Sequence, residues 1–263
     1  MLVAAGTLLS GCTPWMAITS EAGGPVGSTS NGVLVGGRAL PAEGADGYAF
    51  YHQRDRRYGS LALTALVEDV ARDVSSAYPG SVLQVRDLSG DGGGRISGHH
   101  SHRTGMDVDL AFFVRNPKKK STREFVLAKH DALGVAVGDH AVAYFDTPKN
   151  WAVVEALLSS NHADIQWIFI SKGLKARLLA YALAAGKDVE LIEKASMILH
   201  QPKDSAIHND HFHVRIFCPP VDVAPACEQR KPIWPWIKEK QTPPPASVLP
   251  SDHQLMALAL EGL

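Results

Sequence analysis

The chain lacks both a large net charge and a long apolar segment. Its 263 residues carry 26 basic and 27 acidic side chains, so the formal net charge at pH 7 is −1. A charge so close to zero provides no overall attraction to nucleic acid or to an anionic membrane. The apolar stretch over residues 1–12 is too short to cross a bilayer as a helix. We therefore expect a globular protein with no nucleic-acid partner.

Cysteine is also scarce, and the first of the three residues has an informative context. Residues 9–12 read LSGC, which resembles the lipobox of bacterial lipoproteins, where the cysteine carries the lipid. A signal peptide normally starts with a basic region, and residues 1–12 contain none. We expect a truncated start, with residues 1–12 as a signal-peptide remnant and a lipid anchor on Cys12. The alternative is an ordinary cysteine after an apolar N-terminus.

The other two cysteines, Cys218 and Cys227, then remain as an even pair. They lie close together in a loop that contains proline. A short disulfide-closed loop suits an oxidising compartment, whereas two free thiols are more typical of the cytosol. Together with the lipobox, the pair predicts a periplasmic protein, anchored as a lipoprotein at the outer membrane.

Apolar periodicity predicts helices and strands that follow one another without a regular βαβ alternation. We expect strands over 82–88, 106–114, 165–170 and 211–217, and helices over 61–77, from 147, from 172 to the glycine at 186, and over 188–199. Residues 13–46 are rich in Gly, Ser and Ala and are interpreted as a spacer that leads into the domain. This pattern predicts an α+β fold, a single catalytic domain with a mostly antiparallel central sheet flanked by helices.

The Pro-rich extension over residues 221–263 is treated as separate from the domain over 47–220. It carries Trp234 and Trp236, which are either a binding surface or, as is more common, a tail that packs back on the core. We find no internal repeat.

Histidine is unusually clustered. Six of the twelve histidines fall in two short stretches, 99–102 and 208–213. In the strand predicted over 106–114, Asp107 and Asp109 share one face, so that their two carboxylates are expected to point into a site. Gly105 allows the chain to turn between His102 and this strand.

The second stretch has the same alternation. His211, His213 and Arg215 share one face of the predicted strand, while the apolar residues between them point to the core. Two imidazoles, one carboxylate and a water molecule form an open zinc site of the catalytic type. No cysteine is near either stretch, which argues against a closed structural zinc site. The surplus histidines can transfer protons.

The two stretches together resemble a known family. Residues 98–109 read GHHSHRTGMDVD and residues 208–215 read HNDHFHVR. This pair resembles the penicillin-insensitive murein endopeptidases, within the superfamily of lysostaphin-type peptidases, D-Ala-D-Ala metallopeptidases and Sonic hedgehog. Residues 31–32, 40–41 and 56–58 also look like the N-terminal half of that family. The resemblance covers roughly residues 28–220, so 47–220 is interpreted as the zinc peptidase domain.

The resemblance implies a set of site residues. The family's zinc ligands fall on His102, Asp109 and His213, for one zinc per chain, and its general base falls on His211. His99 and His208 match two further active-site histidines that orient the substrate or support the ligands. The implied reaction is hydrolysis of the D-alanyl–meso-diaminopimelyl cross-link between peptidoglycan stem peptides.

Two departures from the family pattern leave alternatives open. His100 stands where relatives often have a small residue. Asp210 lies three residues before His213, where the dipeptidases of the superfamily place a catalytic Glu. Either His211 or Asp210 is therefore the base, and we favour His211 because it shares the strand face of the ligand. Arg95 and Arg215 are candidates to bind a carboxylate of the substrate or the oxyanion that develops in the reaction. For Arg215, a structural ion pair is favoured over this role.

Other classes of function fit less well. A serine hydrolase of the elbow type needs G-x-S-x-G, which is absent from the sequence. An HNH-type nuclease would use His208 and Asn209, but this interpretation gives the first histidine-rich stretch no role. The sequence also has no basic patch that would bind nucleic acid. A D-Ala-D-Ala-type carboxypeptidase or dipeptidase, and a zinc-stabilised binding module without activity, remain as alternatives to the endopeptidase.

Overall fold

The computed structural model describes residues 24–42, 47–50, 55–116, 128–138, 143–220, 224 and 226–241. The strands within these residues are β1 Gly24–Ser28, β2 Asn31–Val35, β3 Arg38–Ala39, β4 Tyr48–Phe50, β5 Tyr58–Gly59, β6 Leu83–Val85, β7 Asp107–Ala111, β8 Val114–Arg115, β9 Tyr144–Phe145, β10 Ile165–Phe169, β11 Leu199–His200 and β12 His211–Ile216. The helices are α1 Leu61–Ala77, α2 Thr147–Ser159, α3 Lys172–Ala184, α4 Val189–Ile198 and α5 Pro235–Gln241.

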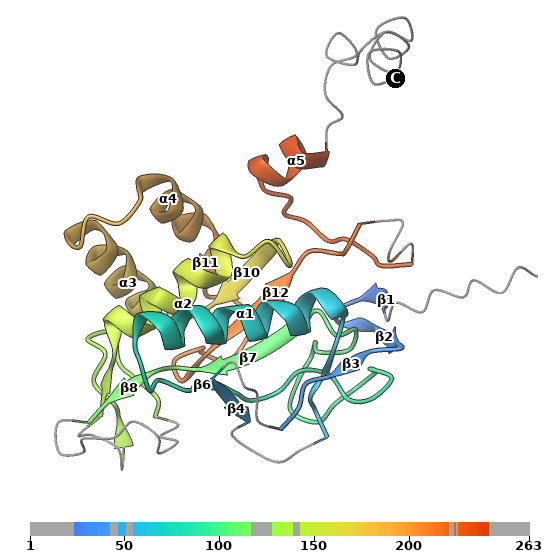
Figure 1. Ribbon diagram of the computed structural model, residues 1–263, viewed down its shortest axis with the longest axis horizontal. Coiled ribbons are helices and arrows are strands. Elements are labelled where there is room, and N and C mark those ends of the chain that lie inside the picture. The colour runs from blue at the N-terminus through green and yellow to red at the C-terminus, as the bar shows by residue number, and fades with distance from the viewer. Residues whose placement is uncertain are drawn as a thin grey trace, which may run out of the picture.

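A six-stranded sheet forms the centre of the fold (Figure 1), in the order β11-β10-β12-β7-β6-β4. The pairs from β10 to β6 are antiparallel. The pairs at the two edges, β11 with β10 and β4 with β6, are parallel. The predicted α+β class is confirmed, and the sheet is mixed: antiparallel at its centre and parallel at its edges.

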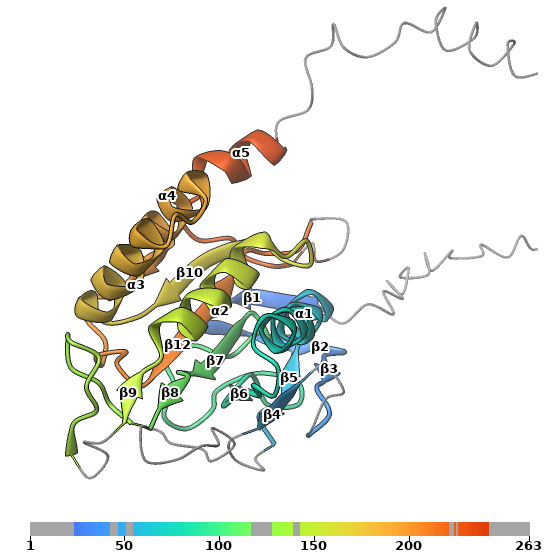
Figure 2. The same ribbon diagram turned by 60° about the vertical axis from the view of Figure 1, so that its left-hand side comes forward.

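Helices α1 and α2 lie side by side across one face of this sheet (Figures 1 and 2). Helix α1 begins where the sequence predicts, because the Ser60 side chain accepts a hydrogen bond from the backbone N–H of Leu63. Its predicted apolar face is buried. Helix α2 also begins at Thr147 as predicted, with Asp146 as the residue that caps it. The apolar face of the sheet and these helices form one core.

The strand that carries Asp107 and Asp109 is shorter than predicted. β7 ends at Ala111, and the chain pairs again only at β8, with β9 as its partner. The expected strand over 82–88 is likewise reduced to β6. Ser171 occupies the capping position of α3, but its side chain makes no capping hydrogen bond there.

The region interpreted as a spacer is structured over much of its length. Residues 24–35 form the antiparallel hairpin of β1 and β2, and β3 pairs with β5 just before α1. This part of the chain therefore differs from the expected spacer, because Gly24, Gly27 and Gly32 lie within paired strands rather than in an open coil. Cys12 and its lipobox lie outside the described residues.

The start of the C-terminal extension is tied to the domain. Cys218 and Cys227 form the predicted disulfide, with an S–S distance of 2.04 Å. The indole N–H of Trp234 donates to the carbonyl of Gln166, and its ring packs edge-on against Trp167. Trp236 stacks on Trp234. The tail thus packs back on the core, the more common of the two alternatives considered. Among the described residues, no helix is long and apolar enough to cross a membrane.

Candidate metal centre

The two histidine-rich stretches meet on the face of the sheet that is opposite α1 and α2. β7 and β12 are antiparallel neighbours, and their register places His213 beside Asp109 and Arg215 beside Asp107. Phe212 and Val214, which alternate with these residues, are fully buried in the core. The predicted division of both strands into a core face and a site face is therefore confirmed.

Three side-chain atoms form a nearly equilateral triangle at the centre of this face. His102 Nε2 lies 3.3 Å from Asp109 Oδ1 and 3.3 Å from His213 Nδ1. His213 Nδ1 lies 3.2 Å from Asp109 Oδ1. All three residues are buried, and Asp109 Oδ1 has no hydrogen-bond partner within the described structure. A buried carboxylate oxygen without a partner is energetically costly unless another group binds it.

The loop before β7 holds His102 in an uncommon backbone conformation. His102 has a φ of 63°, and its N–H donates to Asp107 Oδ2 over 3.1 Å. The Ser89 hydroxyl donates to the His102 carbonyl and accepts from the Gly105 N–H. A Cβ atom on Gly105, where φ is 68°, would lie 2.8 Å from the backbone N of Ser60, so glycine is required there. These contacts stabilise a conformation that costs about 1 kcal/mol or more.

Asp107 lies behind His213 rather than beside Asp109. Its Oδ1 accepts from His213 Nε2 over 2.9 Å and from Arg215 Nε over 2.6 Å. His213 Nδ1 is thereby left to face His102 and Asp109, which is how carboxylates orient metal-bound imidazoles. The expected ion pair of Arg215 is confirmed. The expectation that Asp107 points into the site together with Asp109 is wrong, because the ring of His213 lies between the two carboxylates.

His102 is oriented in the same manner. Its Nδ1 lies 3.1 Å from the carbonyl oxygen of Leu88, which can only accept a hydrogen bond. The proton therefore resides on Nδ1, and the lone pair of Nε2 faces the triangle. When His213 is neutral, its Nδ1 also carries a lone pair, so that two imidazoles can offer lone pairs to the same point.

His211 lies at the rim of the triangle, with Nε2 at 3.6 Å from Asp109 Oδ1. Its Nδ1 makes a short hydrogen bond with Asp210 and lies 3.1 Å from Arg86 Nη1. Since Asp210 accepts the Nδ1 proton, Nε2 retains its lone pair toward the site. The structure places Asp210 behind His211, as the group that orients it.

His99 and His208 complete the histidine cluster. His99 Nε2 lies 3.0 Å from Asp87 Oδ2, and its Nδ1 lies 3.7 Å from Asp109 Oδ2. The ring of His208 lies 5.4 Å from that of His211 and 5.8 Å from that of His213. All six site residues predicted from the sequence are therefore brought together. His100 and Arg95 are exposed.

The electrostatics of the centre favour a positive charge. Burial opposes ionisation of Asp109, yet the imidazoles of His102 and His211 hold its pKa well below the ordinary value. Burial also disfavours a charged His213, but its hydrogen bond to Asp107 and the neighbouring carboxylate of Asp109 raise its pKa to about 9. Burial and the neighbouring His211 lower the pKa of His208 to about 4. Asp107 is already paired with Arg215, so the buried carboxylate of Asp109 is the one that needs a further cation, which a proton or a metal ion can supply.

Several supporting residues were not found from the sequence. Arg86 and Asp87 follow β6, and they contact His211 and His99 respectively. Their signal in the sequence is weak, because two charged residues at the end of a short strand are ordinary. Only the pairing of β6 with β7 brings them to the site.

Three side chains of the site form a cluster that can hold a metal. His99, His102 and Asp109 each offer a ligand atom, and these atoms lie within 4.8 Å of one another. An α+β fold with clustered imidazoles and carboxylates on one sheet face is typical of hydrolytic enzymes with a metal centre.

Comparison with known proteins identifies the family. The model of the family described as penicillin-insensitive murein endopeptidase matches residues 25–237. A Klebsiella pneumoniae subsp. pneumoniae protein called penicillin-insensitive murein endopeptidase is 32% identical over 239 residues, which cover 88% of this chain and 80% of the relative. An Escherichia coli O1:K1 / APEC protein of the same name is 32% identical over 214 residues, 79% of this chain and 72% of the relative. The chain belongs to the penicillin-insensitive murein endopeptidase family, as its two motifs predict.

The position of Asp107 leads to a testable expectation. Replacing Asp107 with asparagine removes the charge that fixes His213 Nδ1 toward the centre. We expect metal affinity to fall by about 10–100-fold, the usual effect of losing a carboxylate behind a ligand histidine. Titration of the metal-free variant with zinc would measure this. Unchanged affinity would show that Asp107 serves only Arg215 and the loop.

Proposed function

We propose that this chain is a zinc-dependent endopeptidase that hydrolyses D-alanyl–meso-diaminopimelyl cross-links of peptidoglycan. The observation that carries the proposal is the triangle of His102 Nε2, His213 Nδ1 and Asp109 Oδ1, in which the last atom is a buried carboxylate oxygen without a hydrogen-bond partner. The family to which the chain belongs, and the names of its relatives, support murein as the substrate.

The triangle fits zinc in its dimensions. Bonds from zinc to nitrogen or oxygen are about 2.0–2.2 Å long, so the ligand atoms of a tetrahedral site lie about 3.3–3.5 Å apart. The three distances of 3.2–3.3 Å are close to this spacing. His99 meets the other oxygen of Asp109 at 3.7 Å. We therefore assign His102, Asp109 and His213 as ligands and place His99 beside them.

The residues around the ligands provide the proton chemistry. When bound, zinc lowers the pKa of a water molecule and polarises a carbonyl group. His211 Nε2 accepts the proton of the attacking water, while Asp210 accepts a hydrogen bond from its Nδ1 and is itself 3.9 Å from Arg86 Nη1. The same nitrogen then returns the proton to the leaving amine of the neighbouring stem peptide.

His208 and His99 flank this centre from two sides. The lowered pKa of His208 keeps its imidazole neutral, so that it can donate or accept a hydrogen bond from the substrate without adding charge. His99 is oriented by Asp87 and can contact the substrate carbonyl. We assign both to substrate orientation.

Digestion of purified muropeptides tests the proposal. We expect cross-linked dimers to be converted to monomers, in the presence of penicillin and not in the presence of a zinc chelator. Penicillin has no effect because the proposed reaction forms no acyl-enzyme that a β-lactam could trap. Mass spectrometry of the products distinguishes the alternatives. Release of a terminal D-Ala from intact dimers would establish a carboxypeptidase, and binding without hydrolysis would establish a zinc-stabilised binding module.

The proposed substrate implies a location outside the cytoplasm. We propose a periplasmic protein held at the outer membrane by a lipid on Cys12, where Thr13 rather than Asp follows the cysteine. The disulfide between Cys218 and Cys227 supports an oxidising compartment. Mass measurement of the mature N-terminus after detergent extraction would detect the lipid.

A further inference from the structure

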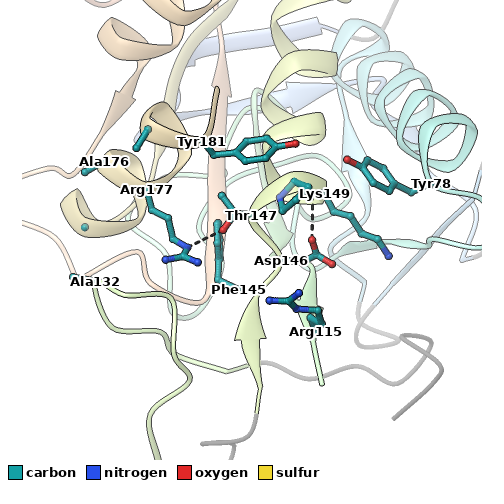
Figure 3. A pocket seen from close by; sticks show the side chains of 13 residues that line it. Tyr78, Arg115, Ala132, Phe145, Asp146, Thr147, Lys149, Ala176, Arg177 and Tyr181 are labelled. Atoms are coloured by element: carbon teal, nitrogen blue, oxygen red, sulfur yellow. Dashed lines mark hydrogen bonds between the residues drawn. The ribbon is translucent and has the colours of Figure 1, made fainter. Parts of the chain in front are cut away.

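A cavity lies beside helices α1, α2 and α3 (Figure 3), and none of the clustered histidines is among the residues that line it. It has a volume of about 940 Å³ and lies between the start of α2, the outer face of α3 and the end of α1. Tyr78 from the end of α1 and Tyr181 from α3 form part of its wall. The space is large enough for a ligand of several residues.

The cavity and the candidate metal centre are on opposite faces of the sheet. Phe145 lines the cavity, and its ring packs edge-on against Phe112, which packs against Phe212. Phe212 points to the core because it alternates with His211 and His213 along β12. A ligand in the cavity is therefore separated from the metal centre by the sheet itself.

Three cationic side chains from three elements converge on the cavity. Arg115 comes from β8, Lys149 from the first turn of α2 and Arg177 from α3. Asp146 is the one carboxylate among the described lining residues, and its side chain accepts from the backbone N–H of Lys149. None of the three cations forms an ion pair with a carboxylate in the described part of the chain. The cavity therefore has an excess of positive charge.

Two of these cations are held in position. Arg177 donates from Nε to the Thr147 hydroxyl over 2.7 Å, which leaves its two terminal nitrogens for another partner. Lys149 Nζ lies 5.8 Å from the centres of the Tyr78 and Phe113 rings. A guanidinium with two terminal donors is suited to carboxylate recognition.

The remainder of the lining is made of small apolar residues. Ala132, Gly173, Ala176 and Ala180 leave space between the cations. Bare phosphate would use the charges but not this apolar surface. A short aliphatic skeleton that carries several carboxylates would use both, and this is the chemistry of a peptidoglycan stem peptide with its D-Ala, D-Glu and diaminopimelyl groups.

We infer that this cavity is a second binding site for a stem peptide of peptidoglycan, distinct from the site of cleavage. The inference rests on the proposed function for the identity of the polymer. It assigns the carboxylates of the peptide to Arg115, Lys149 and Arg177 and its aliphatic parts to the alanine-lined wall. Binding there holds the enzyme on one strand of the polymer while the opposite face acts on another.

Titration of the full chain, labelled with ¹³C at its alanine methyl groups, tests this. The probe is an uncross-linked tetrapeptide that ends in diaminopimelyl-D-alanine. We expect saturable shifts at Ala132, Ala176 and Ala180. The double variant Arg115→Gln/Lys149→Gln should weaken this binding by roughly tenfold or more, because two charge-assisted contacts are lost. Arg72→Gln/Lys194→Gln, which removes the same charge from residues outside the cavity, should leave it unchanged.

A second variant separates the cavity from long-range attraction. Ala180→Trp keeps every charge and fills the space from an exposed helix position, so it should abolish the shifts at the two remaining methyl probes, Ala132 and Ala176. We expect both cavity variants to cleave soluble dimers normally and intact sacculi more slowly. Absence of shifts with the tetrapeptide, or equal shifts with inorganic phosphate, would overturn the inference. Shifts without any cleavage of dimers by the unmodified chain would refute the proposed function and leave the binding site standing.

Discussion

Replacing His213 with alanine should abolish tight zinc binding and reduce hydrolysis of cross-linked dimers by at least about 10³-fold. The substitution removes one corner of the proposed ligand triangle, and a metal bound there would contribute several kcal/mol to the stabilisation of the transition state. His102→Ala should behave in the same way. Metal analysis after dialysis, together with a muropeptide assay, provides both measurements.

His99→Ala is the informative comparison, because His99, His102 and Asp109 also form a cluster that can hold a metal. With His213 as the third ligand, His99→Ala should retain one zinc per chain. His162→Ala, at an exposed histidine outside the cluster, is the matched control for the loss of an imidazole. If His99→Ala loses zinc while His213→Ala retains it, the ligand set is wrong and His99 replaces His213. Circular dichroism distinguishes loss of metal from loss of fold.

Replacing His211 with alanine should separate metal binding from chemistry. We expect the variant to keep its zinc and to lose about 10²–10⁴-fold in rate, which is the range for a general base. His211 touches Asp109 only at 3.6 Å, so its removal leaves the ligand triangle intact. The measurement is the rate of dimer cleavage per zinc-loaded protein.

Asp210→Asn tests the remaining alternative for the base. Because Asp210 contacts His211 Nδ1 and acts through that ring, its replacement should cost about 10–100-fold, less than loss of His211. The opposite ranking would transfer the role of base to Asp210. Asp204→Asn, an exposed aspartate in the segment before β12, serves as the control for removal of a carboxylate.

The local features of this protein could be predicted from the sequence because they depend on neighbouring residues. Ser60 and the apolar spacing after it define α1 to the residue. The alternation of His211, Phe212 and His213 predicts which face of β12 is buried, since successive strand residues point to opposite sides. The paired motifs were sufficient to predict the family, which the comparisons confirm.

The orientation of each functional group could not be predicted in the same way. Asp107 and Asp109 occupy the same face of the predicted strand, yet Asp107 lies behind His213 and Asp109 lies at the centre of the histidine cluster. Asp210 is adjacent in sequence to a candidate base, and only its contact with His211 Nδ1 shows which ring nitrogen is free. These relations depend on the distance between strands that are about a hundred residues apart in the chain.

The sequence by itself determined which residues make up the site, which strand faces are buried and where the helices start. It could do so because propensity, capping and side-chain alternation act within a few residues. Only the tertiary structure decided that Arg86 and Asp87 support the histidines and that three cations from β8, α2 and α3 surround one cavity. Each of these depends on which strands and helices pack side by side, and that choice follows from burial of the whole core rather than from any local pattern.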